Sequence, residues 1–152
     1  MKFLKAVRLS EHDARLLPDE DLLEDGDWAV CGGFAVCDLA SGGHRRPGCR
    51  CDVSFAGLAS PRRCGVAEVV NIDRATYLSH VETLTRQLVE NWGAPSEAAA
   101  RAAAEEEAAC TADLCEGFTP GVWITVQRTA GENGVKERYS VFKRLLIGEH
   151  EL

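Results

Sequence analysis

The fold is decided by residues 73–115, which read DRATYLSHVETLTRQLVENWGAPSEAAARAAAEEEAACTADLC. Seven apolar residues of the first half recur on one face of a 3.6-residue helical turn: Tyr77, Leu78, Val81, Leu84, Leu88, Val89 and Trp92. This spacing predicts an amphipathic helix over residues 74–92 that packs on a broad apolar surface. Asp73 is placed to cap its first turn, and Gly93 followed by Pro95 ends it.

The second half predicts a helix from Ser96, its cap, to Cys115. Alanine dominates this segment, and alanine has the highest helix propensity because it loses no side-chain rotamers. Its predicted apolar face is wide and has Glu107 near the middle: Ala99, Ala100, Ala103, Ala104, Ala108, Cys110, Ala112, Leu114 and Cys115. A carboxylate on such a face is costly to bury without compensation, so we expect Glu107 to have a cation, a hydrogen-bond donor or a raised pKa.

Strands are predicted on both sides of this helical pair. Residues 3–9, 27–37 and 64–72 precede it, and a hairpin of residues 121–129 and 135–143 follows it. We therefore expect one α+β domain over residues 1–152, in which an antiparallel sheet of four to five strands is covered on one face by the helical hairpin. Lys5 and Arg8 place the first strand at a sheet edge. The second strand is apolar on both faces, which predicts that it is covered on both.

The hairpin is the best-marked strand pair. Asn133-Gly134 favours a type I′ turn, and this turn places Val126 opposite Val141 and Arg128 opposite Tyr139. The predicted buried face has four residues: Val122, Ile124, Val126 and Val141. Arg128 continues that face outward, which makes it the expected partner of Glu107.

Composition restricts the function classes. The chain has 152 residues, 45% of them hydrophobic, and a net charge of −7. Nucleic acids and anionic membranes attract positive proteins, so this charge argues against both as partners. No stretch is apolar enough to span a bilayer, and residues 1–10 lack a secretory signal core, so we expect a cytoplasmic protein.

The seven cysteines predict reduced, structural thiols. They are odd in number and contain no C-x-x-C pair, so zinc ribbons and iron–sulfur sites lack their usual spacing. His44, Cys49 and Cys51 could form a partial metal site, but a closed site would need further ligands, and no cofactor is predicted. None of the four histidines stands at a spacing that pairs it with a cysteine, so no residue is assigned a catalytic role: His12, His44, His80 and His150.

Five arginines gather between residues 45 and 63 of this otherwise acidic chain: Arg45, Arg46, Arg50, Arg62 and Arg63. One interpretation is a surface for an anion or an acidic partner, with Arg45, Arg46 and Arg50 as binding residues. The other is solvated loop charge, which is the more common situation.

Five segments together resemble a known family: Trp28–Ala35, Phe55–Leu58, Gly93–Pro95, Ala104–Glu107 and Val126–Thr129. The chain resembles an uncharacterised family of short proteobacterial proteins with no assigned activity. Relatives of that family tend to be encoded near accessory proteins of molybdenum-dependent, formate-dehydrogenase-like enzymes. The resemblance therefore implies a role in enzyme maturation or assembly.

Two functions remain open from the sequence. The first is a non-catalytic binding or accessory protein with a protein partner or a second copy of itself, because no nucleophile, base and orienting group occur together. The second is a small enzyme or ligand-binding domain that uses Glu107 and Arg128 in a pocket between helices and sheet.

Overall fold

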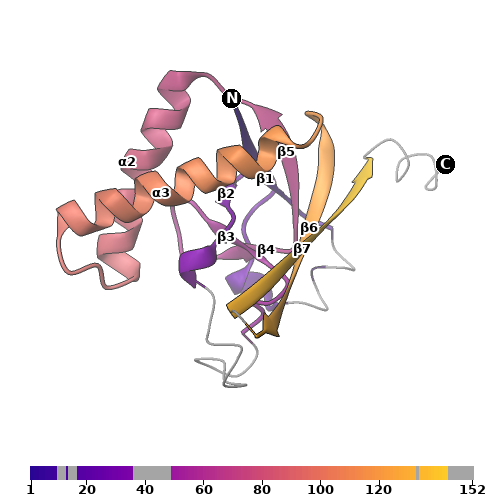
Figure 1. Cartoon of the computed structure of the whole chain (residues 1–152), viewed down its shortest axis with the longest axis horizontal. Coiled ribbons are helices and arrows are strands. Elements are labelled where there is room, and N and C mark those ends of the chain that lie inside the picture. Colours follow the sequence, from indigo (N-terminus) through magenta and orange to yellow (C-terminus); the bar gives the residue numbers. More distant parts are fainter. Residues whose placement is uncertain (10–12, 14–16, 36–48, 133, 144–152) are drawn as a thin grey trace.

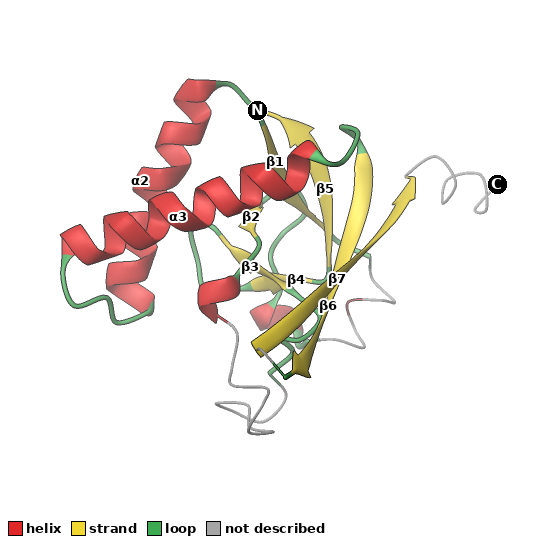
Figure 2. Cartoon of the chain, viewed as in Figure 1, coloured by secondary structure: helices red, strands yellow, loops and turns green. Residues whose placement is uncertain are grey.

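The computed structural model describes residues 1–9, 13, 17–35, 49–132 and 134–143 (Figure 1). Strands, two short 3-10 helices, two long helices and a final hairpin follow one another along the chain (Figure 2). The elements are β1 (Lys2–Val7), η1 (Asp19–Asp21), β2 (Trp28–Val30), η2 (Gly33–Ala35), β3 (Phe55–Gly57), β4 (Arg63–Cys64), β5 (Val66–Asn71), α2 (Arg74–Asn91), α3 (Glu97–Glu116), β6 (Val122–Gly131) and β7 (Gly134–Lys143).

The predicted α+β class is confirmed, but the sheet is larger than expected. Seven strands lie in the order β4-β3-β2-β1-β5-β6-β7, and every neighbouring pair is antiparallel. The prediction of four to five strands was wrong because β3 and β4 have only three and two residues. Strands this short show no alternation that a sequence pattern can detect.

β1 lies inside the sheet, so its predicted edge position was wrong. It pairs with β2 on one side and with β5 on the other. Lys5, the residue that suggested an edge, has partners on the sheet surface. Its ammonium group lies 4.6 Å from the centre of a ring of Trp28, and it stands directly opposite Glu68 on β5.

The second strand is shorter than the predicted 27–37. It ends at Val30, and the chain turns through Gly32 into the 3-10 helix η2. Gly32 has φ 89°, and a Cβ there would lie 2.9 Å from the Cβ of Ala56, so only glycine fits. Val36 and Cys37, the predicted end of this strand, lie outside the described residues.

The hairpin forms as predicted, but its register differs by two residues. Val126 stands opposite Tyr139 and Arg128 opposite Glu137, and the last pair joins Gly131 to Gly134. A shift of two residues leaves every side chain on its original face, so the alternating pattern could not distinguish the two registers. The predicted turn residue Asn133 lies outside the described residues.

Three of the four residues predicted for the buried face of the hairpin are buried. Val122, Ile124 and Val126 have relative exposures of at most 8%, whereas Val141 is 47% exposed. Val141 lies on β7, the last strand of the sheet, where no further strand covers it among the described residues.

Both helices begin where the sequence places their caps. The Asp73 carboxylate accepts the backbone N–H of Thr76, and the Ser96 hydroxyl accepts that of Ala99. Gly93 has φ 69° between the helices. The buried faces are rotated from the predicted ones, since Leu78 and Val89 are exposed on α2 and Ala99, Ala103 and Cys110 are exposed on α3.

Polar bonds account for the rotation of α2. The Gln87 amide donates to the carbonyls of Gly57 and Leu58 at 2.8 and 2.9 Å, so this polar side chain lies inside. The Trp92 indole N–H donates to the Gln87 side-chain oxygen. A helical wheel based on hydrophobicity cannot predict that Gln87 is buried, because it assigns every glutamine to the solvent-facing side.

The core has two main parts on opposite faces of the curled sheet. One lies against α2 and the first half of α3 and contains Phe3, Val30, Leu84 and the buried alanines of α3. The other lies within the curl and contains Leu4, Phe55 and Ile124, with Cys115 near the end of α3. α3 thus packs on α2 at one end and reaches the inner core at the other (Figure 1).

His80 of α2 is buried, and its Nε2 atom has no hydrogen-bond partner among the described residues. Its ring centroid lies 4.8 Å from that of Phe3 and 4.4 Å from that of Trp28. Burial lowers the pKa of His80 from 6.5 to about 4. The unfolded chain therefore binds a proton between these two pH values that the folded chain does not bind.

We predict that the free energy of unfolding falls as the pH drops from 6.5 towards 4, with His80 contributing about 1.4 kcal/mol per pH unit. Above pH 6.5 this residue adds no slope, because it is neutral in both states. The measurement is chemical denaturation across this range, with His80→Phe as the control that retains an aromatic ring but does not titrate. Equal slopes for wild type and control would contradict the prediction.

Candidate functional site

Arg128 of β6 is 3% exposed, and its guanidinium group donates four hydrogen bonds to other described residues. One terminal nitrogen, Nη1, donates to the carbonyls of Cys51 and Ser54, both at 2.7 Å. The other, Nη2, donates to the carbonyl of Cys31 at 2.5 Å, and Nε donates to the Glu137 carboxylate at 2.8 Å. The backbone N–H of Arg128 also donates to the carbonyl of Asp52. Arg128 therefore joins three separate segments of the chain.

Glu107 of α3 lies nearby, at the margin of the buried helix face. Its Oε1 accepts the backbone N–H of Gly32 at 2.5 Å. Burial raises its pKa, while the N–H groups of Gly32 and Gly33 and the charge of Arg128 partly offset the rise. One turn further along α3, the Thr111 hydroxyl accepts the N–H of Cys31 at 3.0 Å. Two side chains of α3 thus hold the turn that follows β2, because they accept hydrogen bonds from the backbone N–H groups of that turn.

The structure brings Glu107 and Arg128 to the same turn but does not pair them directly. Glu107 binds the N–H of Gly32, whereas Arg128 binds the carbonyl of Cys31 and has Glu137 as its ion-pair partner. The expected direct pair is wrong because the backbone between them supplies both a donor and an acceptor. The expectation that Glu107 has a donor and a raised pKa is confirmed.

A second buried arginine, Arg63 on β4, extends this network. It donates to the carbonyl of Ala35 at 2.5 Å and to the hydroxyl of Ser54 at 3.2 Å. The Ser54 hydroxyl in turn donates to the carbonyl of Arg50. Sequence reasoning treated Arg63 as loop charge. Its place directly before Cys64, where the predicted strand of residues 64–72 begins, was the available signal that it belongs to a strand.

The other predicted binding residues do not form one basic surface among the described residues. Arg50 lies 3.4 Å from the Asp52 carboxylate, and Arg62 lies 4.0 Å from that of Glu24. Arg45 and Arg46 lie outside the described residues, as do His12, His44 and His150. The described arginines of this segment are thus either buried or beside an acidic side chain.

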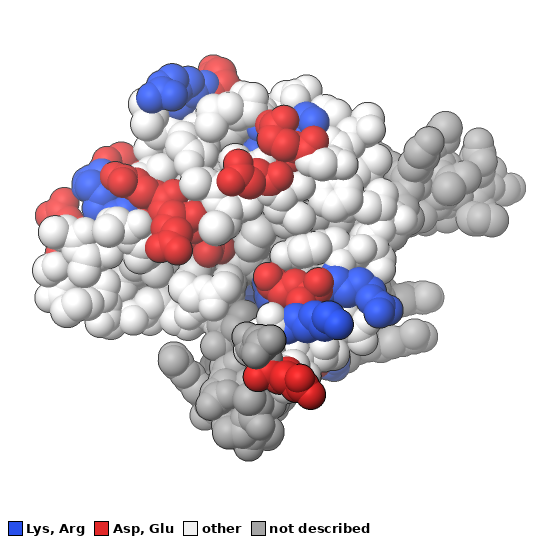
Figure 3. Space-filling model, in the orientation of Figure 1, with Lys and Arg blue, Asp and Glu red and all other residues white. Residues whose placement is uncertain are grey.

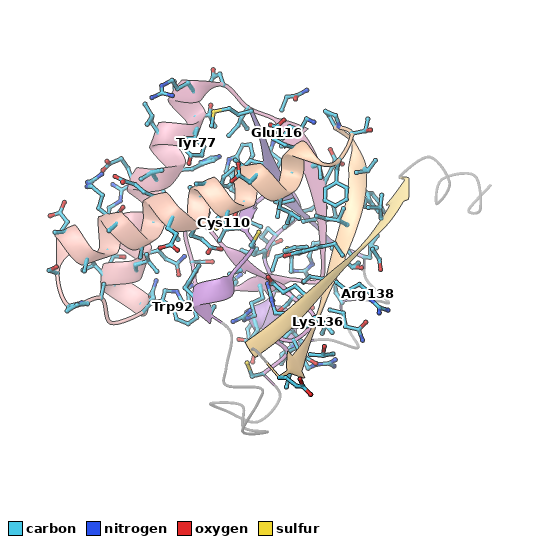
Figure 4. All side chains as sticks on the ribbon, in the orientation of Figure 1. Tyr77, Trp92, Cys110, Glu116, Lys136 and Arg138 are labelled. Carbon is cyan, nitrogen blue, oxygen red and sulfur yellow. The ribbon has the colours of Figure 1, made fainter. Side chains whose placement is uncertain are left out.

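Three buried cysteines are poor candidates for a reactive thiolate. Burial raises the pKa of Cys31 and of Cys115 to about 12 and raises that of Cys64 further. These thiols are protonated at neutral pH. Within residues 1–35 and 49–143, as far as they are described, no three histidine, cysteine or acidic side chains gather as metal ligands would. Cys110 is exposed on α3 (Figure 4).

The arrangement is therefore a latch of hydrogen bonds. Charged side chains of α3, β4 and β6 bind backbone groups of two segments, residues 31–35 and 50–54. Buried carbonyls that lose such donors are costly, because water cannot replace the bond.

We predict that Arg128→Met lowers the free energy of unfolding by about 3 to 5 kcal/mol, because it leaves buried carbonyls without a donor. Glu137→Gln, which changes the partly exposed partner of the same arginine, should cost at most about 1 kcal/mol. Urea denaturation of both variants measures the contrast. A small loss for Arg128→Met, or equal losses, would show that the carbonyl bonds do not hold the fold together.

We predict that Glu107→Gln is tolerated, because its amide oxygen can still accept the N–H of Gly32. Since burial raises the folded-state pKa of Glu107, the contribution of this residue to stability declines as the pH rises through the acidic range, opposite in sign to the contribution of His80. Glu107→Gln removes this decline and should be at least as stable as wild type at pH 7. Glu107→Ala removes the acceptor and should cost about 1 to 3 kcal/mol. A Gln variant that is as unstable as the Ala variant would contradict the assignment.

Comparison with known proteins gives a family but no activity. No curated protein matches the chain, and no solved structure matches it. None of the helices in the described part of the chain is both long enough and apolar enough to cross a lipid bilayer. One family model matches residues 1–147, which is nearly the whole sequence. The chain belongs to the Family of unknown function (DUF6505).

Proposed function

We propose that this protein is a non-catalytic binding or assembly protein. The observation that carries the proposal is the latch, in which the side chains best suited to chemistry already bind the protein's own backbone. Arg128 directs its donors to three carbonyls and to Glu137, and Glu107 accepts from Gly32. Burial keeps the thiols of Cys31, Cys64 and Cys115 protonated, which makes these three cysteines poor nucleophiles.

The second part of the proposal concerns the cellular process in which this protein takes part. The family resemblance implies accessory proteins of molybdenum-dependent enzymes, so the proposed partner is a subunit or maturation factor of such an enzyme. A cytoplasmic setting is part of the proposal, and the free cysteines among the described residues are in keeping with a reducing compartment.

The surface between the two helices is the proposed docking site. A hollow of about 350 Å³ lies beside the corner that joins α2 to α3. Val89, Ala94 and Pro95 give it an apolar part, and Arg86 and Arg101 flank it together with glutamates. Val89 is 45% exposed. Figure 3 shows acidic side chains over α2 and α3, so a partner with a complementary positive rim would be steered to this face.

Affinity purification of the tagged chain from its own host tests this proposal. We expect a subunit or maturation factor of a molybdenum-dependent enzyme to co-purify with wild type and with Glu107→Gln. Val89→Asp should abolish recovery, while the matched control Leu78→Asp, on an exposed part of the same helix outside the hollow, should not. Failure to recover such a partner would overturn the proposed process, and recovery with Val89→Asp would overturn the proposed surface.

A second candidate function has one observation in its favour. Glu107 is partly accessible and carries a raised pKa, as a proton-transferring or ligand-binding carboxylate does. If a small ligand binds there, wild type should gain thermal stability from a metabolite library and Glu107→Gln should not. If Glu107→Gln does not change partner recovery and no ligand stabilises wild type, the ligand-binding candidate is overturned and only the protein-binding role remains.

A further inference from the structure

In the part of the chain that the structure describes, the sheet ends in a strand with one unpaired edge. β7 has ten residues, contains no proline, and pairs along its whole length with β6. Apart from that pairing, no backbone hydrogen bond joins residues 134–143 to another described residue. Half of its backbone N–H and C=O groups therefore face outward at a sheet edge, where they can pair with another strand.

Two exposed apolar residues lie on this strand. Val135 is 44% and Val141 47% exposed, and their even spacing puts them on the same face. On the opposite face, the exposed Lys136 and Arg138 project from β7 (Figure 4). The charged residues discourage indiscriminate pairing at this edge, whereas the valines favour a partner that covers them.

We propose that β7 pairs antiparallel with β7 of a second copy of this chain, centred on Arg138. Alternate residues of a strand direct their backbone groups to the same side, so directly opposed residues of two identical edges must be separated by an even number of positions. A symmetric pairing must therefore centre on a residue and not between two residues. Only a few such registers overlap along most of β7.

The side chains select among these registers. Centring on Glu137 opposes it to its own copy and opposes Lys136 to Arg138, which gives like charges at three successive positions. Centring on Tyr139 opposes Val141 to the charged Glu137 and leaves Val135 without Val141 opposite it. Centring on Lys136 overlaps only residues 134–138.

Centring on Arg138 gives the best match. Val135 then faces Val141 of the other copy, and this contact occurs twice by symmetry. Glu137 faces Tyr139, Lys136 faces Ser140, and the single unfavourable contact is Arg138 with its own copy. Because one strand pair buries little surface, the expected dimer is weak and concentration-dependent. Self-pairing does not require the assembly role proposed above, and the purified chain tests it alone.

Sedimentation of the full-length chain over a range of concentrations provides the test. Wild type should show a monomer–dimer equilibrium, and Val135→Asp or Val141→Lys should each raise the dissociation constant at least about tenfold. The double variant Val135→Asp/Val141→Lys should restore dimerisation, because each aspartate then faces a lysine of the other copy. Within one chain these positions are six residues apart on a strand, about 20 Å, and cannot pair.

Two further variants keep the result unambiguous. Arg138→Thr should tighten the dimer by removing the one like-charge contact, and Val89→Asp, an exposed valine on α2, should leave it unchanged. Near-ultraviolet circular dichroism confirms that each variant is folded. A wild-type chain that stays monomeric at the highest accessible concentration overturns the proposal. So does a dimer that survives the single β7 substitutions, or a double variant that fails to recover.

Discussion

The buried guanidinium of Arg128 is the interaction on which the arrangement of this fold depends. Arg128 joins distant parts of the curled seven-stranded sheet, because it links β6 to carbonyls at residues 31, 51 and 54. A planar, permanently charged fork can reach several carbonyls at fixed angles, which the single point charge of lysine cannot do. The ion pair with Glu137 supplies the opposite charge at the solvent side.

The buried polar side chains of the latch bind the protein's own backbone. Arg128, Arg63, Glu107 and Thr111 direct their polar atoms to backbone groups that would otherwise be buried without partners. The proposed contacts with other molecules use the outer faces of α2, α3 and β7 instead. Figure 3 shows acidic side chains over the helices and basic side chains mixed with acidic ones on the hairpin.

The sequence was sufficient for features that are decided within one element. The caps at Asp73 and Ser96, the helical hairpin and the paired strands β6 and β7 depend on neighbours along the chain. Features decided between elements could not be read from it. The rotation of α2 depends on carbonyls of β3, and the two-residue change of the hairpin register leaves the pattern of faces unaltered. Glu107 was identified from its position on the wheel, but its partner is a backbone N–H that no side-chain pattern encodes.

The alanine-rich face of α3 has a consequence for the uniqueness of the native state. Methyl groups allow close approach but give a smooth surface, on which a helix can turn about its axis at little cost. The hydrogen bonds of Glu107 and Thr111 with the backbone after β2 then fix the rotation of the whole helix about its axis. Without these hydrogen bonds, we expect α3 to remain helical and packed on the core but to adopt several rotations about its own axis. The hydrogen bonds of Glu107 and Thr111 therefore select one helix orientation from several of nearly equal energy. A melting temperature alone would understate this contribution.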